Sequence, residues 1–315
     1  MNSGSRELLL LRHGTAEAGG GDDRTRALTD PGKRDVQRMG VHLAANDWLP
    51  DTAVASPATR THVSAEKALK AAGLGVASLG LEPGIYGAST TALMGVLASF
   101  GEAPHRVLMV GHNPGISDLA TVLTGRPVMF APGMLARLRM PEDWTVLRPG
   151  TASLLAHVDP RMLPRDFPFP SPHGAERRSR PAYYYAQSGV VPYRRTPDGL
   201  QIMIIGSSKR KHQVVPKGIV TPGMSATASA AKEAREEAGI EGIVDDASLG
   251  TFTYDKWGAQ VVCEVYPMRV TTVLDTSAWA ESHRGRSWVS PEVAVETLGR
   301  DGLRRMVHAL VERLR

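Results

Sequence analysis

Apolar and polar positions alternate along the first half of the chain in two different periods. Short apolar runs, such as the four leucines at positions 8–11, are separated by longer stretches in which apolar residues recur every three or four positions. The expected strands are residues 7–11, 52–55, 106–110, 135–140 and 153–157. The expected helices are residues 31–46, 57–72, 90–100 and 114–124. This alternation predicts an α/β sandwich around a mostly parallel sheet.

The starts of these helices carry a second signal. The pairs Asp30-Pro31, Ser56-Pro57 and Asn113-Pro114 each set a capping side chain before a proline at the expected first helical position. Two of the helices follow a strand almost at once, so their exposed N–H groups would point to one edge of the sheet. Such an edge predicts an anion site.

A proline-rich segment divides the chain. Residues 159–181 contain Pro160, Pro164, Pro168, Pro170, Pro172 and Pro181, with Arg177, Arg178 and Arg180 near the end. Proline at this density opposes regular helix and predicts a semi-extended connector. We therefore expect a domain over residues 1–158, a linker over 159–181 and a second domain over 182–315.

The second domain has a different pattern, with strands grouped on either side of a helix. The expected strands are residues 183–193, 200–206, 213–220, 251–254 and 259–273. The expected helix, residues 226–238, is stopped by Gly239, where a left-handed cap is wanted. Two terminal helices should start at Pro291 and Gly302. The pattern predicts an α+β domain.

Composition narrows the class of protein. An apolar fraction of 42% and an aromatic fraction of 5% suit core-forming domains. The single cysteine, Cys263, excludes an internal disulfide and a cysteine-based zinc site. We expect no signal peptide and no membrane span, and hence a cytoplasmic protein. A net charge of +5 favours anionic partners without implying a nucleic-acid polymer.

Candidate chemistry begins at Arg12-His13-Gly14, directly after the first apolar run. Arginine offers a planar fork for phosphate, histidine is a nucleophile or acid, and we expect the glycine to leave room for an oxyanion. Arg60 lies in the first turn of an expected helix, and His112 lies between a strand and a helix. Arg26 can reach the same pocket from a loop. Together these residues predict a phosphoryl-transfer site.

The motifs Leu-Arg-His-Gly, Leu-Thr-x-x-Gly, Ser-Pro-x-x-Arg-Thr and Val-Gly-His-Asn-Pro-Gly resemble the histidine phosphatase superfamily over about residues 6–125. Within it, the chain is most similar to SixA-type phosphohistidine phosphatases. The resemblance implies an α/β/α sandwich without a cofactor, with His13 as the nucleophile. It implies that Arg12, Arg60 and His112 bind the phosphoryl group. The acid for the leaving group is left open between His112 and Glu82.

In the second domain, Glu233, Glu236 and Glu237 lie on one face of the expected helix. Glutamates alone favour a solvated helix face, with Lys232 and Arg235 offsetting their repulsion. The same carboxylates are also the oxygen ligands that Mg²⁺ requires.

The surrounding residues resemble the Nudix box, in which a glycine, an Arg-Glu pair and Glu-Glu-x-Gly recur at fixed spacing. The matching positions are Gly218, Glu233, Glu236, Glu237, Gly239 and Ile240. The resemblance implies a Nudix α/β/α sandwich in which Glu233, Glu236 and Glu237 bind Mg²⁺, or Mn²⁺ in its place. It also implies that Glu236 and Glu237 take part in catalysis. Met224 replaces the first box glutamate and Lys232 the arginine, which weakens the support of the loop. Because the helix glutamates are the implied metal ligands, we expect the site to stay competent.

The Pro-Lys-Gly opening and the stretch 250–256 resemble Nudix enzymes that cleave diphosphoinositol and diadenosine polyphosphates. Cations that suit such substrates are Arg194, Arg195, Lys209, Arg210, Lys211 and Lys217. Lys209 and Lys211 are equally consistent with a solvated turn, whereas Lys217 adjoins the box glycine. Tyr183–Tyr185 and Trp257 are candidates for base stacking, and a place in the core or at the pocket rim suits them better.

The sequence therefore predicts a bifunctional phosphohydrolase that acts on small phosphorylated substrates. One domain would cleave a pyrophosphate bond with Mg²⁺, and the other would remove a phosphoryl group from the product or from a phosphohistidine protein. Two alternatives stay open: a MutT-like enzyme that sanitises oxidised nucleotides, and a phosphohistidine phosphatase whose Nudix domain is a sensor.

Overall fold

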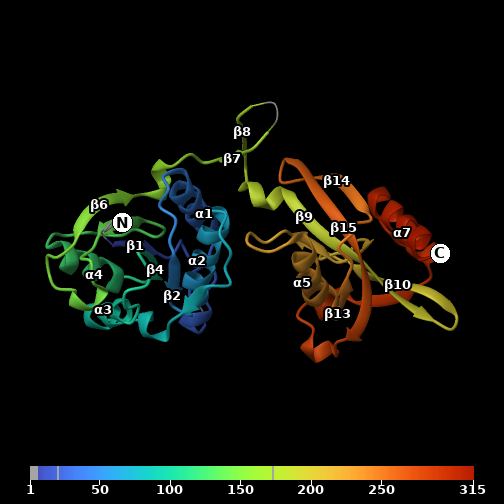
Figure 1. The fold of residues 1–315 in the computed structure, drawn as a ribbon, viewed down its shortest axis with the longest axis horizontal. Helices are drawn as coiled ribbons and strands as arrows, with labels where there is room; N and C mark the ends of the chain where they lie inside the picture. Colours follow the sequence, from blue (N-terminus) through green and yellow to red (C-terminus); the bar gives the residue numbers. More distant parts are fainter. Residues whose placement is uncertain (1–5, 20, 172–173) are drawn as a thin grey trace. The chain divides into compact units, whose positions relative to one another are not determined.

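The computed structural model describes residues 6–19, 21–171 and 174–315. It divides into two compact units, Met1–Pro181 and Ala182–Arg315, which we describe separately (Figure 1). Pro172 of the proline-rich segment lies outside the described residues.

The first unit is built on one mixed sheet. Its strands are β1 (Glu7–Arg12), β2 (Thr52–Ala55), β3 (Leu79–Leu81), β4 (Arg106–Gly111), β5 (Leu135–Arg139) and β6 (Ser153–Val158). The spatial order is β3-β2-β4-β1-β5-β6. The strands β3, β2, β4 and β1 are parallel, β5 pairs antiparallel with β1, and β6 pairs antiparallel with β5. The carboxyl ends of β2, β4 and β1 therefore meet at one edge.

Helices cover both faces of this sheet. They are α1 (Asp30–Ala45), α2 (Thr59–Ala71), α3 (Thr90–Ala98) and α4 (Gly115–Thr124). Leu8 and Leu10 of β1 share a core with α3 and α4. Leu9 and Leu11 point to the other face and pack with α1 and α2. Because successive side chains of a strand alternate in direction, the leucine run supplies both cores, and the expected α/β/α sandwich is confirmed.

The expected helix caps are wrong in detail. Thr29 caps α1, because its hydroxyl accepts a hydrogen bond from the Gly32 N–H at 3.0 Å, and Asp30 is already helical. The helices α2 and α4 begin at Thr59 and Gly115 without a side-chain cap. The Ser56 hydroxyl contacts a histidine ring, as described below, and the peptide bond before Pro114 is cis.

The proline-rich segment contains regular structure. A 3₁₀ helix (Pro160–Met162) is followed by the hairpin of β7 (Phe167–Phe169) and β8 (Glu176–Arg178). Phe167 is buried, and Leu163 packs against the core beneath α1 and α2. The first half of this segment is therefore folded onto the first unit instead of forming an extended connector.

The second unit has an eight-stranded sheet. Its strands are β9 (Ala186–Thr196), β10 (Gly199–Gly206), β11 (Gln213–Val214), β12 (Lys217–Ile219), β13 (Ile240–Val244), β14 (Gly250–Lys256), β15 (Ala259–Val273) and β16 (Arg286–Val289). The path is β11-β10-β9-β15-β13, with β12 on β9, β14 on β15 and β16 on β10. The long strands β9 and β15 pair in parallel, and the other pairs are antiparallel.

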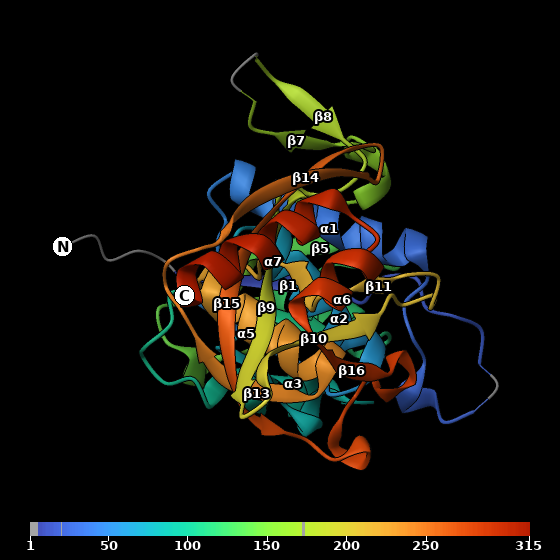
Figure 2. The same cartoon turned by 90° about the vertical axis from the view of Figure 1, so that its right-hand side faces the viewer.

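The helices of the second unit are α5 (Ala226–Ala238), α6 (Pro291–Thr297) and α7 (Asp301–Leu314). Figure 1 shows α5 and α7 on opposite sides of the sheet, and Figure 2 shows α6 next to α7. Gly239 ends α5 with φ 61°, the left-handed cap that the sequence predicts. The remaining 3₁₀ helices of the first unit are Asp23–Thr25, Pro83–Ile85 and Trp144–Val146. Those of the second unit are Ala182–Tyr185, Thr276–Ala278 and Ser282–Arg284.

None of the helices in the described part combines the length and the apolar character that crossing a membrane requires.

Candidate active sites

The predicted phosphoryl-transfer residues of the first unit meet at the carboxyl edge of its sheet. Arg12 ends β1, His112 follows β4, and Arg60 lies in the first turn of α2 behind β2. The rings of His13 and His112 lie edge to face, with centroids 5.3 Å apart. The parallel order of β2, β4 and β1 brings these residues together across about a hundred positions of sequence.

His13 has the tautomer that an attacking imidazole needs. Its Nδ1–H donates to the Gly14 carbonyl oxygen at 2.7 Å, which leaves Nε2 unprotonated in the neutral ring. Burial, followed by the positive charges of Arg60, Arg12 and Arg26, lowers the pKa of His13 to about 4. The ring is therefore neutral, and its free nitrogen is nucleophilic, at physiological pH.

The ring of His112 contacts a buried serine. Its Nε2 lies 3.0 Å from the hydroxyl oxygen of Ser56, a residue with no exposed surface. Burial, followed by the charge of Arg60, lowers the pKa of His112 to about 4. In the described part of the chain, His112 Nδ1 and Arg12 Nε are buried without a hydrogen-bond partner. Arg12 Nε, left without a partner beside His13, is suited to an oxyanion, and so is His112 Nδ1 in the tautomer in which Ser56 donates to Nε2.

Asp23 joins the arginines of this site. Its carboxylate accepts hydrogen bonds from Arg60 Nη2 at 2.7 Å, from Arg26 Nη1 at 2.9 Å and from the Tyr86 hydroxyl at 2.8 Å. The Tyr86 hydroxyl, then Arg26 and Arg60, hold the pKa of Asp23 well below its usual range. Neither Asp23 nor Tyr86 was among the residues predicted from the sequence. A phosphoryl group that reaches Arg60 and Arg26 has to exchange with the Asp23 carboxylate.

Two expectations for this site need revision. A Cβ on Gly14 would lie 2.5 Å from the Gly32 carbonyl oxygen, so the glycine serves the close approach of α1, and space for an oxyanion is not its main reason. Glu82 caps the 3₁₀ helix after β3, where its carboxylate accepts the Gly84 N–H at 2.8 Å. That local bond occupies one oxygen of the Glu82 carboxylate, whereas the His112 ring lies beside His13.

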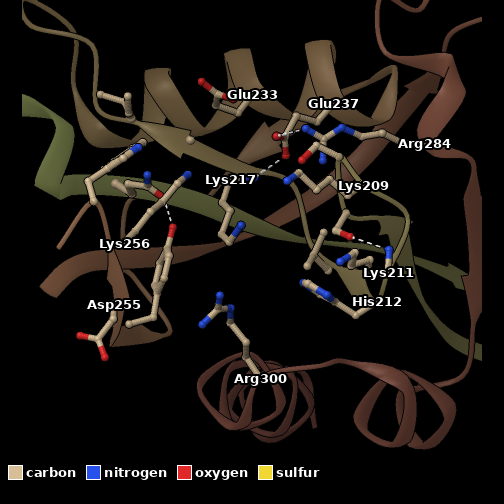
Figure 3. A pocket seen from close by; sticks show the side chains of 18 residues that line it. Lys209, Lys211, His212, Lys217, Glu233, Glu237, Asp255, Lys256, Arg284 and Arg300 are labelled. Atoms are coloured by element: carbon tan, nitrogen blue, oxygen red, sulfur yellow. Dashed lines mark hydrogen bonds and ion pairs between the residues drawn. The ribbon is translucent and has the colours of Figure 1, made fainter. Parts of the chain in front are cut away.

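In the second unit, two of the three box glutamates border a strongly cationic pocket of about 500 Å³. Glu233 and Glu237 reach it from α5, as Figure 3 shows. The cationic side chains around it are Lys209, Lys211, Lys217, Lys256, Arg284 and Arg300. Such a lining suits a polyanionic ligand.

Glu237 is the most firmly held carboxylate of the pocket. Its Oε2 accepts the Lys217 backbone N–H at 3.0 Å, and its Oε1 accepts Arg284 Nη2 at 2.6 Å. Only 9% of the residue is exposed, and burial raises the pKa of its carboxyl group despite these partners.

Glu233 lies one helical turn earlier, beside the box glycine. A Cβ on Gly218 would lie 2.1 Å from the Glu233 carboxyl carbon, so the glycine leaves the space that this carboxylate fills. Burial, followed by the charge of Glu237, raises the pKa of Glu233 to about 7.

Glu236 is not brought into this pocket. Its side chain is 45% exposed and pairs with Lys232 Nζ at 3.0 Å on the outer face of α5. Within the described ranges, no group of three His, Cys, Asp or Glu residues is already gathered to hold a metal. The oxygen donors of Glu233 and Glu237 fit a hard divalent cation in their chemistry, and the third predicted ligand has to turn to join them.

Of the predicted substrate-binding cations of the second unit, some lie in the pocket and one lies outside it. Lys217 and Lys209 line the pocket. Arg194 does not: its guanidinium lies 4.2 Å from the Trp288 ring centre and donates to Gln201 at 2.8 Å. The structure adds Arg284 and Arg300, which belong to no motif in the sequence, and Lys256, which ends the stretch 250–256 but had no binding role assigned to it.

The aromatic candidates are already covered by protein groups. Lys256 Nζ lies 4.2 Å from the Trp257 ring centre. Tyr254, a pocket residue that was not among the candidates, is covered in the same way by the Arg300 guanidinium, 4.3 Å from its ring centre. Tyr184 packs edge-on against Trp257, and Tyr185 is buried.

Comparison with known proteins yields two kinds of likeness, on different parts of the chain. No family model matches the sequence. The protein histidine phosphatase SixA complexed with tungstate is a structural neighbour with a TM-score of 0.44 and 21% identity, covering 49% of this chain and 97% of that one. The Caenorhabditis elegans Ap4A hydrolase has a TM-score of 0.35 and 20% identity, covering 42% of this chain and 98% of that one.

Sequence relatives come from Arabidopsis thaliana. Nudix hydrolase 21, chloroplastic, is 29% identical over 144 residues, which are 44% of this chain and 71% of that protein. Nudix hydrolase 17, mitochondrial, is 31% identical over 136 residues, which are 40% of this chain and 73% of that protein. With this identity over nearly three quarters of a known member, the chain belongs to the Nudix hydrolase family.

Proposed function

We propose that the protein is a bifunctional phosphohydrolase. The second unit would cleave a pyrophosphate bond in a diphosphoinositol polyphosphate or a dinucleoside polyphosphate, and the first would remove a phosphoryl group through a phosphohistidine. The observation that carries the pyrophosphatase activity of the second unit is the pair Glu233 and Glu237 at the wall of a cationic pocket. The phosphatase activity of the first unit is carried by the unprotonated His13 Nε2, which lies between arginines and His112.

In the second unit, Glu233 and Glu237 would hold Mg²⁺, or Mn²⁺ in its place, with Glu236 as the third ligand after its side chain leaves Lys232. The cation would supply charge neutralisation on the pyrophosphate and a lower pKa for the attacking water. A box glutamate would accept a proton from the attacking water while the water oxygen bonds to phosphorus, the P–O anhydride bond breaks, and the two phosphate products leave. Lys217, Lys256 and Arg300 bind the phosphates and orient the scissile bond.

In the first unit, His13 Nε2 attacks the phosphorus in line and the bond to the leaving group breaks. Arg12, Arg60 and His112 carry the negative charge of the phosphoryl oxygens. Water then cleaves the N–P bond, which releases inorganic phosphate and restores His13. For a phosphohistidine protein the leaving group is an imidazole, which takes its proton from solvent, or from His112 once the bound phosphoryl group has raised the pKa of His112.

The pocket favours phosphate recognition over base recognition. Arg300 lies over Tyr254 and Lys256 over Trp257, so both rings already have cationic partners. This supports the polyphosphate substrates over an oxidised nucleotide that is selected through its base.

The pyrophosphatase proposal is tested with the purified full-length chain and Mg²⁺. Substrates are a diphosphoinositol polyphosphate, diadenosine tetraphosphate and 8-oxo-dGTP. Glu237→Gln and Glu233→Gln should each lower kcat by at least about a hundredfold, a size typical of losing one catalytic group. Glu312→Gln, on the exposed face of α7, is the matched control and should keep full activity. Unchanged cleavage by both pocket variants rejects the assignment.

The phosphatase proposal is tested separately, without Mg²⁺, on a small phosphoester and on a phosphohistidine protein. His13→Ala should abolish phosphate release and leave Mg²⁺-dependent cleavage intact. His62→Ala, in α2, is the matched control. Loss of both activities in His13→Ala would contradict two independent sites. Phosphohistidine turnover by a chain whose second unit only binds its ligand would favour the sensor alternative.

A further inference from the structure

Arg284 occupies an unusual position for a cation outside the Nudix motif. It lies in the 3₁₀ helix Ser282–Arg284, and its side chain is only 9% exposed. Its Nη2 donates to Glu237 Oε1 at 2.6 Å, and its Nε donates to Glu281. A third, longer contact joins Nη1 to the Gly206 carbonyl oxygen at 3.4 Å. One guanidinium therefore bridges two carboxylates inside the pocket wall.

The segment that carries Arg284 is anchored to the catalytic helix. The Glu281 N–H donates to the Glu236 carbonyl oxygen of α5 at 3.3 Å. Lys232, at the place of the box arginine, points outward to Glu236 instead. The positive charge beside Glu237 thus comes from a residue 47 positions later in the chain. It does not come from the motif.

The contacts of Glu237 set Arg284 in competition with a metal ion. Oε2 is taken by the Lys217 N–H, so Oε1 is the oxygen that a hard cation would use, and Arg284 holds it. A guanidinium that gives up this oxygen still lies at the wall of a pocket lined by Lys217, Lys256 and Arg300. Its planar fork matches two phosphate oxygens as well as it matches carboxylates.

We propose that Arg284 is an exchangeable counter-ion of the metal site. It neutralises Glu237 and Glu281, yields Glu237 to the divalent cation, and then binds a phosphate of the substrate. The inference rests on the proposed pyrophosphatase function and deepens it, because metal binding would deliver the guanidinium that grips the substrate. Arg284 therefore competes with the metal ion before it binds, and contacts the substrate afterwards.

The test measures Mn²⁺ affinity in the full-length protein without substrate, by titration calorimetry or by electron paramagnetic resonance. In Arg284→Gln the competing charge is gone, so Mn²⁺ should bind about tenfold more tightly. The KM for the pyrophosphate substrate should rise by about tenfold, because a phosphate contact is lost. Arg284→Lys keeps the charge without the fork, so its Mn²⁺ affinity should stay near that of the wild type.

Arg235→Gln is the matched control, since it removes one positive charge from the exposed face of α5. Thermal unfolding of each variant separates a folding defect from a binding effect, and Arg284→Lys keeps the KM comparison interpretable if Arg284→Gln unfolds. Weaker or unchanged Mn²⁺ binding in a folded Arg284→Gln would show that Arg284 only holds Glu237 and Glu281 in place, and would overturn the proposal. If neither the wild type nor Arg284→Gln binds Mn²⁺, the proposed metal-dependent function fails, and this inference fails with it.

Discussion

Burial and neighbouring arginines act in the same direction on the histidines of the first unit. The pKa of His13 and that of His112 are each lowered to about 4, first by burial and then by positive charge. An imidazole that is neutral at pH 7 keeps the lone pair that attacks phosphorus. In the proposed reaction the arginines would bind the phosphoryl oxygens, and the same charges help to keep His13 unprotonated.

This arrangement predicts an acid-shifted titration, which NMR of the imidazole carbons can follow. His13 and His112 should titrate near pH 4 instead of near the ordinary 6.5. Because the unfolded chain binds more protons between about pH 6.5 and pH 4, the free energy of unfolding of this unit should fall as the pH is lowered through that window. Above about pH 6.5 the contribution is fully present.

Tungstate or phosphate should raise both pKa values, because an anion favours the imidazolium form. Arg60→Gln should raise the pKa of His13 without any ligand, since it removes a nearby positive charge. Titration of His13 at or above pH 6.5 in the ligand-free wild type would contradict the described environment.

Motifs locate some of these residues and miss others for a physical reason. His13, Arg60 and His112 sit in local patterns of strand, turn and helix, so the sequence predicts that they meet. Asp23 reaches Arg60 across 37 positions, and Arg284 reaches Glu237 across 47. Neither lies in a pattern of its own, and an acidic loop residue or a late arginine gains meaning only from its partner in space.

At the scale of elements, the contact between β12 and α5 decides where the box carboxylate lies. Gly218 of β12 leaves the volume that the Glu233 carboxyl group fills. The atom that an added methyl group would meet is the end of a flexible side chain, which can turn away at little cost in stability. Displacing that carboxylate from the pocket should harm catalysis far more than folding.

We therefore predict that Gly218→Ala lowers pyrophosphate cleavage by about a hundredfold, the loss expected from a misplacement of about 1 Å. Its unfolding temperature should change by no more than a few degrees. Gly95→Ala, in α3 with no atom within 4 Å of the added group, is the control and should stabilise the first unit by about 1 kcal/mol. An activity loss that merely follows the fraction of unfolded protein would refute this role for Gly218.

Local signals explain which elements are predictable. The helix α5 has its expected bounds because an alanine-rich stretch ends at a glycine that adopts the left-handed conformation. The strands β3, β13 and β16 went unpredicted, since they are short, partly exposed and defined by their pairing with distant strands. Two expected caps are wrong because the Ser56 hydroxyl contacts His112 and because the Thr29 hydroxyl, instead of Asp30, accepts the Gly32 N–H.

At the scale of the whole molecule, the chain has separate hydrophobic cores in its two units. The core of the second unit consists of residues from β9 to α7, and those of the first unit lie on the two faces of its sheet. The Nudix relatives confirm the family that the box motif indicates, and the strand and helix pattern correctly gave both fold classes. Independent cores predict independent unfolding.

Differential scanning calorimetry should therefore resolve two transitions. Leu10→Ala, at a fully buried position of β1, should lower only the transition of the first unit, at a cost of about 2–5 kcal/mol. Leu303→Ala, equally buried in α7, is the matched change in the second unit and should lower only the other transition. A single transition that both substitutions shift would argue for one cooperative body.

The central place of β1 has a consequence for synthesis on the ribosome. Leu9 lies opposite Leu108 on one side and Arg137 on the other, so the first strand of the unit waits for partners made about a hundred residues later. At ordinary translation speeds this delay is on the order of ten seconds, during which the leucine run has no sheet to enter. The nascent chain should therefore bind chaperones that shield apolar segments, whereas β9 finds β10 as soon as the next turn emerges.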